Sequence, residues 1–259
     1  MTENYPLVEG FDLTVSGGIG TLVIDRPAAR NALSRDMWRA LPDIVATAEE
    51  DPDLRVLVLT GAGDHFSAGS DIHDLAVPLT DFWDLNSTAE AALAEARIPT
   101  IAAVRGSCIG GGTELAAACD FRIAAPGSRF GVTAAKLGLV YPPGPSRRLA
   151  EVFGTSWAKY LLVTGNLIDH EVAERLGFLH AVDPAPLDAA LALARTVVSR
   201  SALSQGATVR LLAGEEFDAA TTERLAAAYD REIAEGQEAF FAKRSPEFSV
   251  QRTTWPDPA

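Results

Sequence analysis

The sequence predicts an α/β protein in which a parallel sheet occupies the first half of the chain and helices occupy the second. In the first half, short β-branched and apolar segments alternate with segments of helical periodicity, the pattern of strands joined by crossover helices. From Pro145 onward, stretches rich in alanine, leucine and glutamate replace this alternation. The chain has 259 residues, which favours one large α/β unit with a helical extension.

The elements of the first half follow from local patterns. Glycines and Pro27 bound the first apolar strand, and a helix starts after Ser34, a good N-cap, with Met37 and Leu41 at helical spacing. The strands are predicted at residues 18–25, 55–60, 100–104 and 121–125. Further helices are predicted at residues 80–97 and in the segment ELAAACD, and later at 187–199, 207–212 and 217–235.

The composition excludes several classes of protein. The 22 basic and 35 acidic residues give a net charge of −13, which argues against binding to nucleic acid or to an anionic membrane. Two cysteines, Cys108 and Cys119, are too few for a disulfide framework or a four-ligand zinc site. Without a long apolar run or a signal-peptide pattern, the sequence favours a cytoplasmic protein.

Common glycine-rich and catalytic motifs are absent from the sequence. It contains no P-loop, no G-x-G-x-x-G dinucleotide fingerprint and no G-x-S-x-G nucleophile elbow. The four histidines form no H-x-x-x-H or H-x-H pair, so we expect no metal site.

Two small-residue loops each follow a predicted strand, at residues 64–75 and 104–120. Ligands bind at the carboxyl ends of strands in open α/β sheets, and small residues allow backbone N–H groups to approach a ligand. Two such amides can form an oxyanion hole, where one donor is worth about 3 kcal/mol in the transition state. The alternative interpretation is that both loops are simply tight turns.

Glu114 lies one turn into the helix that follows the second loop, among glycines, alanines and leucine. An apolar pocket raises the pKa of a carboxyl group, which suits it to accept and return a proton near neutral pH. The alternative is an ordinary first-turn glutamate that complements the helix dipole.

The segments FSAGSDI and RGSCIGGGTELAAACD, with DRPAARNALS and TGNLIDHEVAERLGFLHAV, resemble the crotonase superfamily of enoyl-CoA hydratases and isomerases. The resemblance implies a spiral core of ββα units in residues 1–195, which holds an acyl-CoA site. It also implies a helical trimerisation region in residues 196–259, and a homotrimer or a dimer of trimers. The substrate would be an acyl-CoA thioester, with no separate cofactor.

The resemblance also implies the roles of individual residues. The amides of Ser70 and Gly111 would form an oxyanion hole for a thioester enolate, and Glu114 would be the catalytic acid–base. The residues expected to contact coenzyme A are Ala28, Ala29, Arg30, Ala68, Ser70, Asp71, Ile72 and Lys243, the last often from a neighbouring subunit. For Asp71, a role in fixing its loop is the stronger expectation, and we expect His73 to be a solvated loop residue.

One departure from the family pattern bears on the reaction. Hydratases of this family carry a second glutamate in a pattern resembling F-G-x-P-E, and Ala134 occupies that position here. Because hydration benefits from two carboxylates, this loss favours isomerisation with Glu114 as the single base. Decarboxylation of a malonyl-type CoA is the alternative, in which Tyr141 would contribute by similarity to methylmalonyl-CoA decarboxylase. A non-catalytic acyl-CoA-binding protein is the third possibility.

Overall fold

The computed structural model describes residues 3–5 and 8–250, and its largest element is a seven-stranded mixed sheet. The strand order is β1 (Glu3–Tyr5), β2 (Phe11–Ser16), β3 (Ile19–Ile24), β4 (Val56–Gly61), β5 (Thr100–Val104), β7 (Phe121–Ala124) and β10 (Ala181–Val182). The strands from β3 to β10 pair in parallel, whereas β1, β2 and β3 pair antiparallel. The predicted α/β class and its four strands are confirmed.

A second, smaller sheet is present that no sequence pattern predicts. It consists of β6 (Ser107–Ile109), β8 (Arg129–Gly131) and β9 (Ile168–Asp169). Strands of two or three residues are too short for a period-two pattern to be read, so tertiary pairing alone reveals them. An isolated bridge between Ser67 and Cys108 joins the first small-residue loop to this sheet.

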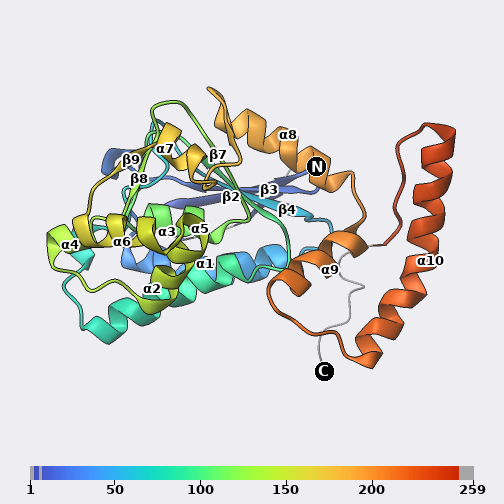
Figure 1. The fold of residues 1–259 in the computed structure, drawn as a ribbon, viewed down its shortest axis with the longest axis horizontal. Helices are drawn as coiled ribbons and strands as arrows, with labels where there is room; N and C mark the ends of the chain where they lie inside the picture. The colour runs from blue at the N-terminus through green and yellow to red at the C-terminus, as the bar shows by residue number, and fades with distance from the viewer. Residues whose placement is uncertain (1–2, 6–7, 251–259) are drawn as a thin grey trace.

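Helices cover both faces of the large sheet (Figure 1). The main hydrophobic cluster, on one side, takes buried residues from α1 (Arg35–Glu50), α2 (Leu79–Ala94), α3 (Gly111–Ala118), α4 (Ala134–Leu137), α5 (Pro143–Phe153), α6 (Thr155–Thr164) and α7 (His170–Arg175). On the other side, α8 (Pro186–Val198) packs on the parallel strands through buried alanines and valines. The predicted N-cap is confirmed, because Ser34 accepts a hydrogen bond from the Met37 amide at 3.3 Å.

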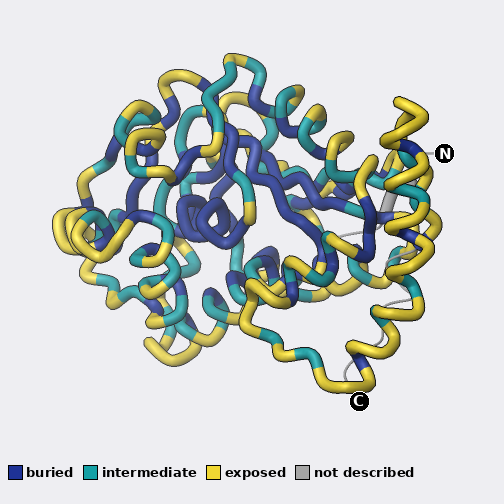
Figure 2. Tube along the Cα trace, turned by 45° about the vertical axis from the view of Figure 1, so that its right-hand side comes forward, coloured by how far each residue is buried: buried dark blue, intermediate teal, exposed yellow. Residues whose placement is uncertain are grey.

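Helix α3 lies in the middle of the molecule, and all of its eight residues are buried. Figure 2 shows this helix as a continuous buried coil among the strands. Its alanines and glycines allow the neighbouring helices to approach closely, which explains why such a short helix can be covered on every side. Glu114, on this helix, is only 1% exposed.

Two helices end the described chain, α9 (Ala202–Leu212) and α10 (Ala219–Ala242). Helix α9 packs against the core, where Arg55 Nη2 donates to Gln205 Oε1 at 2.9 Å, whereas α10 stands apart from it (Figures 1 and 2). They carry large exposed apolar side chains, namely Leu211, Leu212, Tyr229, Ile233, Phe240 and Phe241. The expected division at residue 195 falls inside α8, and it stays a prediction together with the trimerisation role. In the described part of the chain, no helix combines the length and the apolar character needed to cross a membrane.

Candidate active site

A cavity of about 80 Å³ lies where the two small-residue loops meet helices α2 and α4. Its wall is formed by Ala68, Ser70, Ile72, Leu75, Phe82, Asn86, Gly110, Gly111, Thr133, Ala134, Leu137, Leu139 and Tyr141. Ser70 and Gly111, whose amides the family resemblance implies as the oxyanion hole, therefore belong to one cavity wall. We call this space the acyl cavity.

A single backbone bridge sets the orientation of the Ser70 amide. Leu33 donates its amide to the Gly69 carbonyl and accepts one from the Asp71 amide, both at 2.8 Å. Because N–H groups alternate in direction along an extended chain, the Ser70 N–H faces away from Leu33. It donates to no acceptor within the described residues, so it is available to a ligand.

The glycine run before α3 brings the second amide to the same place. A Cβ atom on Gly69 would lie 2.9 Å from the Gly111 nitrogen, and one on Gly112 would lie 2.5 Å from the Ser67 carbonyl oxygen. Side chains at these positions would push the two loops apart. The Gly111 amide is in the first turn of α3, where N–H groups lack intrahelical acceptors, and it too has no acceptor in the described chain.

Glu114 is hydrogen-bonded to Tyr141. Tyr141 is a residue of the cavity wall, and Glu114 lies behind it. The Tyr141 hydroxyl donates to Glu114 Oε2 at 2.5 Å, while Glu114 Oε1 is buried and accepts no hydrogen bond from the described residues. Burial raises the pKa of Glu114 well above its usual value, although the hydrogen bond from Tyr141 opposes this.

A second carboxylate lies behind this pair. Glu90 of α2 is 3% exposed and forms an ion pair with Arg148 of α5. Burial is the largest cause of the raised pKa of Glu90, which Arg148 opposes. The negative charge of Glu90 adds to the rise in the pKa of Glu114. No local sequence signal links these residues, because Glu90 and Arg148 are 58 positions apart.

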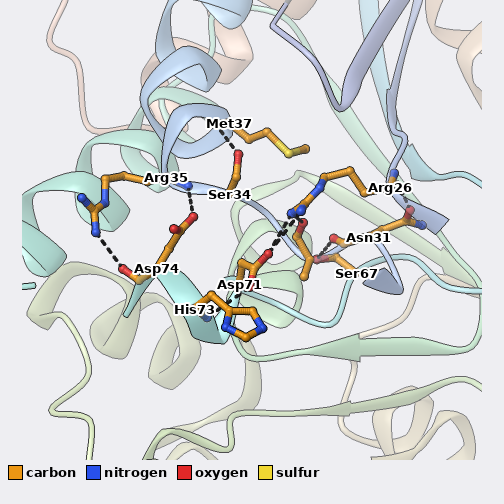
Figure 3. A network of polar contacts seen from close by, with 10 residues as sticks. Arg26, Asn31, Ser34, Arg35, Met37, Ser67, Asp71, His73 and Asp74 are labelled. Carbon is orange, nitrogen blue, oxygen red and sulfur yellow. Dashed lines mark hydrogen bonds and ion pairs between the residues drawn. The ribbon is translucent and has the colours of Figure 1, made fainter. Parts of the chain in front are cut away.

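A network of polar contacts fixes the loop that carries Ser70 (Figure 3). Both terminal nitrogens of Arg26 donate to Asp71 Oδ2 at 3.2 Å, and Asp71 Oδ1 accepts the His73 amide at 3.1 Å. Asp74 Oδ2 accepts the Arg35 amide at 2.8 Å. The Asp71 side chain thus bonds to its own loop and to Arg26, the fixing role that the sequence favoured for it.

The other residues expected to contact coenzyme A lie around this loop, with one exception. The Arg30 carbonyl accepts the Ala68 amide at 2.9 Å, which places the turn at residues 27–30 beside the cavity wall. Ile72 lines the cavity and is 68% exposed. Lys243 caps the end of α10 and does not line the cavity. All these contacts to coenzyme A remain predictions.

The structure also places residues at the site that the sequence did not predict. Asn86 of α2 and Leu139 of the loop before α5 line the acyl cavity, and only the packing of these two elements brings them there. Leu75, at the end of the first small-residue loop, is a further wall residue. Ala134, the position of the missing second glutamate, lies in the wall and presents only a methyl group. Among the described residues, no three His, Cys, Asp or Glu side chains are grouped as metal ligands would be.

Comparisons with known proteins assign the chain to a family. The model of the enoyl-CoA hydratase/isomerase family matches residues 14–252. A probable enoyl-CoA hydratase of Mycobacterium bovis is 34% identical over 246 residues, which are 89% of this chain and 94% of that protein. An enoyl-CoA isomerase/hydratase of Mycosarcoma maydis is 35% identical, with 90% of this chain and 93% of that protein covered.

A solved structure agrees with these sequence matches. An enoyl-CoA hydratase/isomerase family protein from Hyphomonas neptunium superposes with a TM-score of 0.86 and 33% identity, over 95% of this chain and 99% of that one. The chain belongs to the enoyl-CoA hydratase/isomerase family, also called the crotonase superfamily, and is an acyl-CoA enzyme of that type.

Proposed function

We propose that this protein isomerises the double bond of an enoyl-CoA thioester, with Glu114 as its only carboxylate base. The observation that carries the proposal is the Glu114–Tyr141 pair beside a cavity whose wall contains no carboxylate in the described chain. Hydration benefits from a second carboxylate to activate water, and the methyl group of Ala134 cannot do this. Movement of one proton between two carbons needs only one acid–base system.

The proposed reaction begins when the amides of Ser70 and Gly111 donate hydrogen bonds to the thioester oxygen. A C–H bond at the α-carbon of a 3-enoyl thioester breaks, and its electrons form an enolate that these amides stabilise. Tyr141 Oη takes the proton and passes its own proton to Glu114 Oε2. The relay then runs in reverse at the γ-carbon, so that the 2-enoyl thioester forms and Glu114 is again ionised.

The raised pKa of Glu114 supports this role, because a carboxyl group that titrates closer to neutral pH can both accept and return a proton. We expect Glu114→Gln to lower kcat for 3-enoyl-CoA by at least about 100-fold. Tyr141→Phe should have an effect of similar size if the proton passes through its hydroxyl. Tyr160→Phe, at a partly exposed tyrosine on α6, is the matched control.

The measurement is the conversion of 3-enoyl-CoA to 2-enoyl-CoA, with 2-enoyl-CoA hydration assayed in parallel. Unchanged turnover in Glu114→Gln would remove this residue from the mechanism. Binding of acyl-CoA thioesters without turnover of any of them would instead support a non-catalytic binding protein.

Decarboxylation of a malonyl-type CoA is the second candidate, and one observation favours it. Tyr141 is a residue of the cavity wall, whereas Glu114 is not. Loss of CO₂ breaks the bond to the α-carbon and forms the enolate directly, so the oxyanion hole and a proton donor suffice. This reaction predicts CO₂ release that survives Glu114→Gln and falls in Tyr141→Phe.

A further inference from the structure

A second, smaller cavity of about 20 Å³ adjoins the acyl cavity beside Ser70. The two cavities share four wall residues, namely Ser70, Leu75, Phe82 and Asn86. The smaller space, which we call the side chamber, is completed by Leu33, Arg35, Trp38, Asp74, Val77 and Leu85. A group on an acyl chain that passes Ser70 would therefore meet polar side chains that the proposed reaction does not use.

Trp38, which lines the side chamber, carries an unpaired donor. Its side chain is 2% exposed, and its Nε1–H group is buried with no acceptor among the described residues. The indole packs directly against the first turn of α3, since a Cβ atom on Gly111 would lie 2.5 Å from Trp38 Cζ2. A buried donor left unpaired destabilises the site, so a ligand oxygen bonded to it would be favoured.

Asn86 contributes an acceptor. Its side chain is 2% exposed, and Nδ2 donates to the Phe82 carbonyl at 2.8 Å. This bond sets the orientation of the amide and leaves Oδ1 as the acceptor, which receives no hydrogen bond from the described residues. Together, Trp38 and Asn86 offer one donor and one acceptor, the complement of a hydroxyl group.

The charges and the size of the side chamber favour a small neutral group. Arg35 and Asp74 also line it, but they carry opposite charges and bond each other through the Arg35 amide and through Arg35 Nη2, the latter at 3.1 Å to the Asp74 carbonyl (Figure 3). A carboxylate or an ammonium would therefore lack a net countercharge. A space of about 20 Å³ accommodates one oxygen-sized group, because a water needs about 10–15 Å³.

We propose that the natural acyl group carries a hydroxyl beyond the reacting carbons, and that the side chamber binds this hydroxyl. Trp38 Nε1–H donates to its oxygen, and Asn86 Oδ1 accepts its proton. The Ser70 hydroxyl, at the junction of the two cavities, is a further polar contact along the path. This inference deepens the proposed function and rests on it, since it requires an acyl-CoA in the acyl cavity.

The test measures binding and not turnover. Saturated ω-hydroxyacyl-CoA thioesters of four, five and six carbons are compared by titration calorimetry with the unsubstituted thioesters of equal length. These ligands lack the double bond, so neither isomerisation nor hydration consumes them. At one chain length, the hydroxylated thioester should bind about tenfold more tightly to the wild-type protein, because its hydroxyl gains two hydrogen bonds in the side chamber.

Two variants test whether the side chamber causes the tighter binding of the hydroxylated thioester. Trp38→Phe and Asn86→Leu should each lower the ratio of the two affinities by about threefold or more. The ratio cancels any general loss of affinity caused by repacking. Trp83→Phe is the matched control, because the Trp83 indole donates to the Val140 carbonyl at 2.8 Å and does not line the side chamber; it should leave the ratio unchanged.

Equal binding of the hydroxylated and plain thioesters at every chain length would overturn the inference. It would also be overturned if both variants kept the wild-type ratio, or if an ω-carboxyacyl-CoA bound more tightly than the hydroxylated ligand. If no thioester binds at all, the proposed function fails instead, so the two failures are distinguishable.

Discussion

Glu114 is a carboxyl group whose ionisation is controlled by residues from three different helices and loops. Burial in α3 is the dominant cause of its raised pKa, Tyr141 opposes the rise, and the charge of Glu90 adds to it. The ion pair with Arg148 offsets the free-energy cost of burying the negative charge of Glu90. Glu90 therefore acts on the proposed base through electrostatics, without contact to the acyl cavity.

We predict that Glu90→Gln shifts the pH profile of kcat/KM. Removal of the negative charge of Glu90 lowers the pKa of Glu114, so the ionised base persists to lower pH and the acidic limb of the profile moves downward in pH. The profile is measured in parallel for Glu151→Gln, an exposed carboxylate that also contacts Arg148, at 3.6 Å. An upward shift, or equal shifts in both variants, would contradict this account.

At the scale of elements, the loop that carries Ser70 is held by side chains from the preceding turn. The Arg26 guanidinium donates to the Ala32 carbonyl at 2.6 Å and to the Asp71 carboxylate (Figure 3). It therefore joins the two segments that the bridge between Leu33 and Ser70 also pairs. A short 3₁₀ turn at Ile72–Asp74 follows, with Asp71 as its N-cap. The direction of the Ser70 amide is thus determined by contacts between segments about 45 residues apart.

We expect Arg26→Met to lower kcat roughly tenfold, because a small displacement of an oxyanion-hole donor weakens its bond in the transition state. Asp71→Asn should have a comparable effect, and the double variant should lose little more than either single variant. Arg39→Met is the control, since Arg39 forms an exposed ion pair with Asp36 on α1. Fully additive losses in the Arg26 and Asp71 variants would show that the two residues act separately.

At the scale of the whole molecule, a buried arginine joins the central sheet to the segment that leads into the C-terminal helices. Arg122 of β7 is 6% exposed, its Nε donates to the Phe178 carbonyl at 2.6 Å, and its guanidinium lies 5.0 Å from the Phe178 ring centre. His180 Nδ1 accepts the Arg122 amide at 3.2 Å. This bond requires a neutral imidazole, because a protonated ring has no acceptor nitrogen.

Stability should therefore depend on pH through His180. Burial, and then the charge of Arg122, lower the pKa of His180 below 6.5. Between that lowered pKa and about 6.5, the unfolded chain binds more protons than the folded one, so stability falls as the pH drops below 6.5. The difference in urea midpoint between pH 7.5 and pH 5.5 should shrink in His180→Gln.

The control for this measurement is His73→Gln, at the exposed histidine of the Ser70 loop. Its midpoints should show the same pH dependence as the wild-type protein. A His180→Gln variant that keeps the full wild-type difference would show that other groups set the acid sensitivity.

Local patterns in the sequence were sufficient to predict the α/β class and four of the seven strands of the large sheet. The Ser34 cap, the apolar spacing after it and the glycine run before α3 each act within a few residues, so a linear pattern records them. Strand β2, which forms an antiparallel hairpin with β3 through Gly17 and Gly18, and the two- and three-residue strands were missed.

The linear chain itself contains the glycines that let the two loops meet, the glutamate in the first turn of α3 and the loss of a second glutamate at Ala134. Which partners surround that glutamate was decided only by the tertiary structure. Tyr141 comes from the loop before α5, Glu90 and Asn86 come from α2, and Trp38 comes from α1. Their contacts with the site depend on how these three elements pack around α3. Such packing is fixed by shape and burial across the whole core, and no spacing along the chain encodes it.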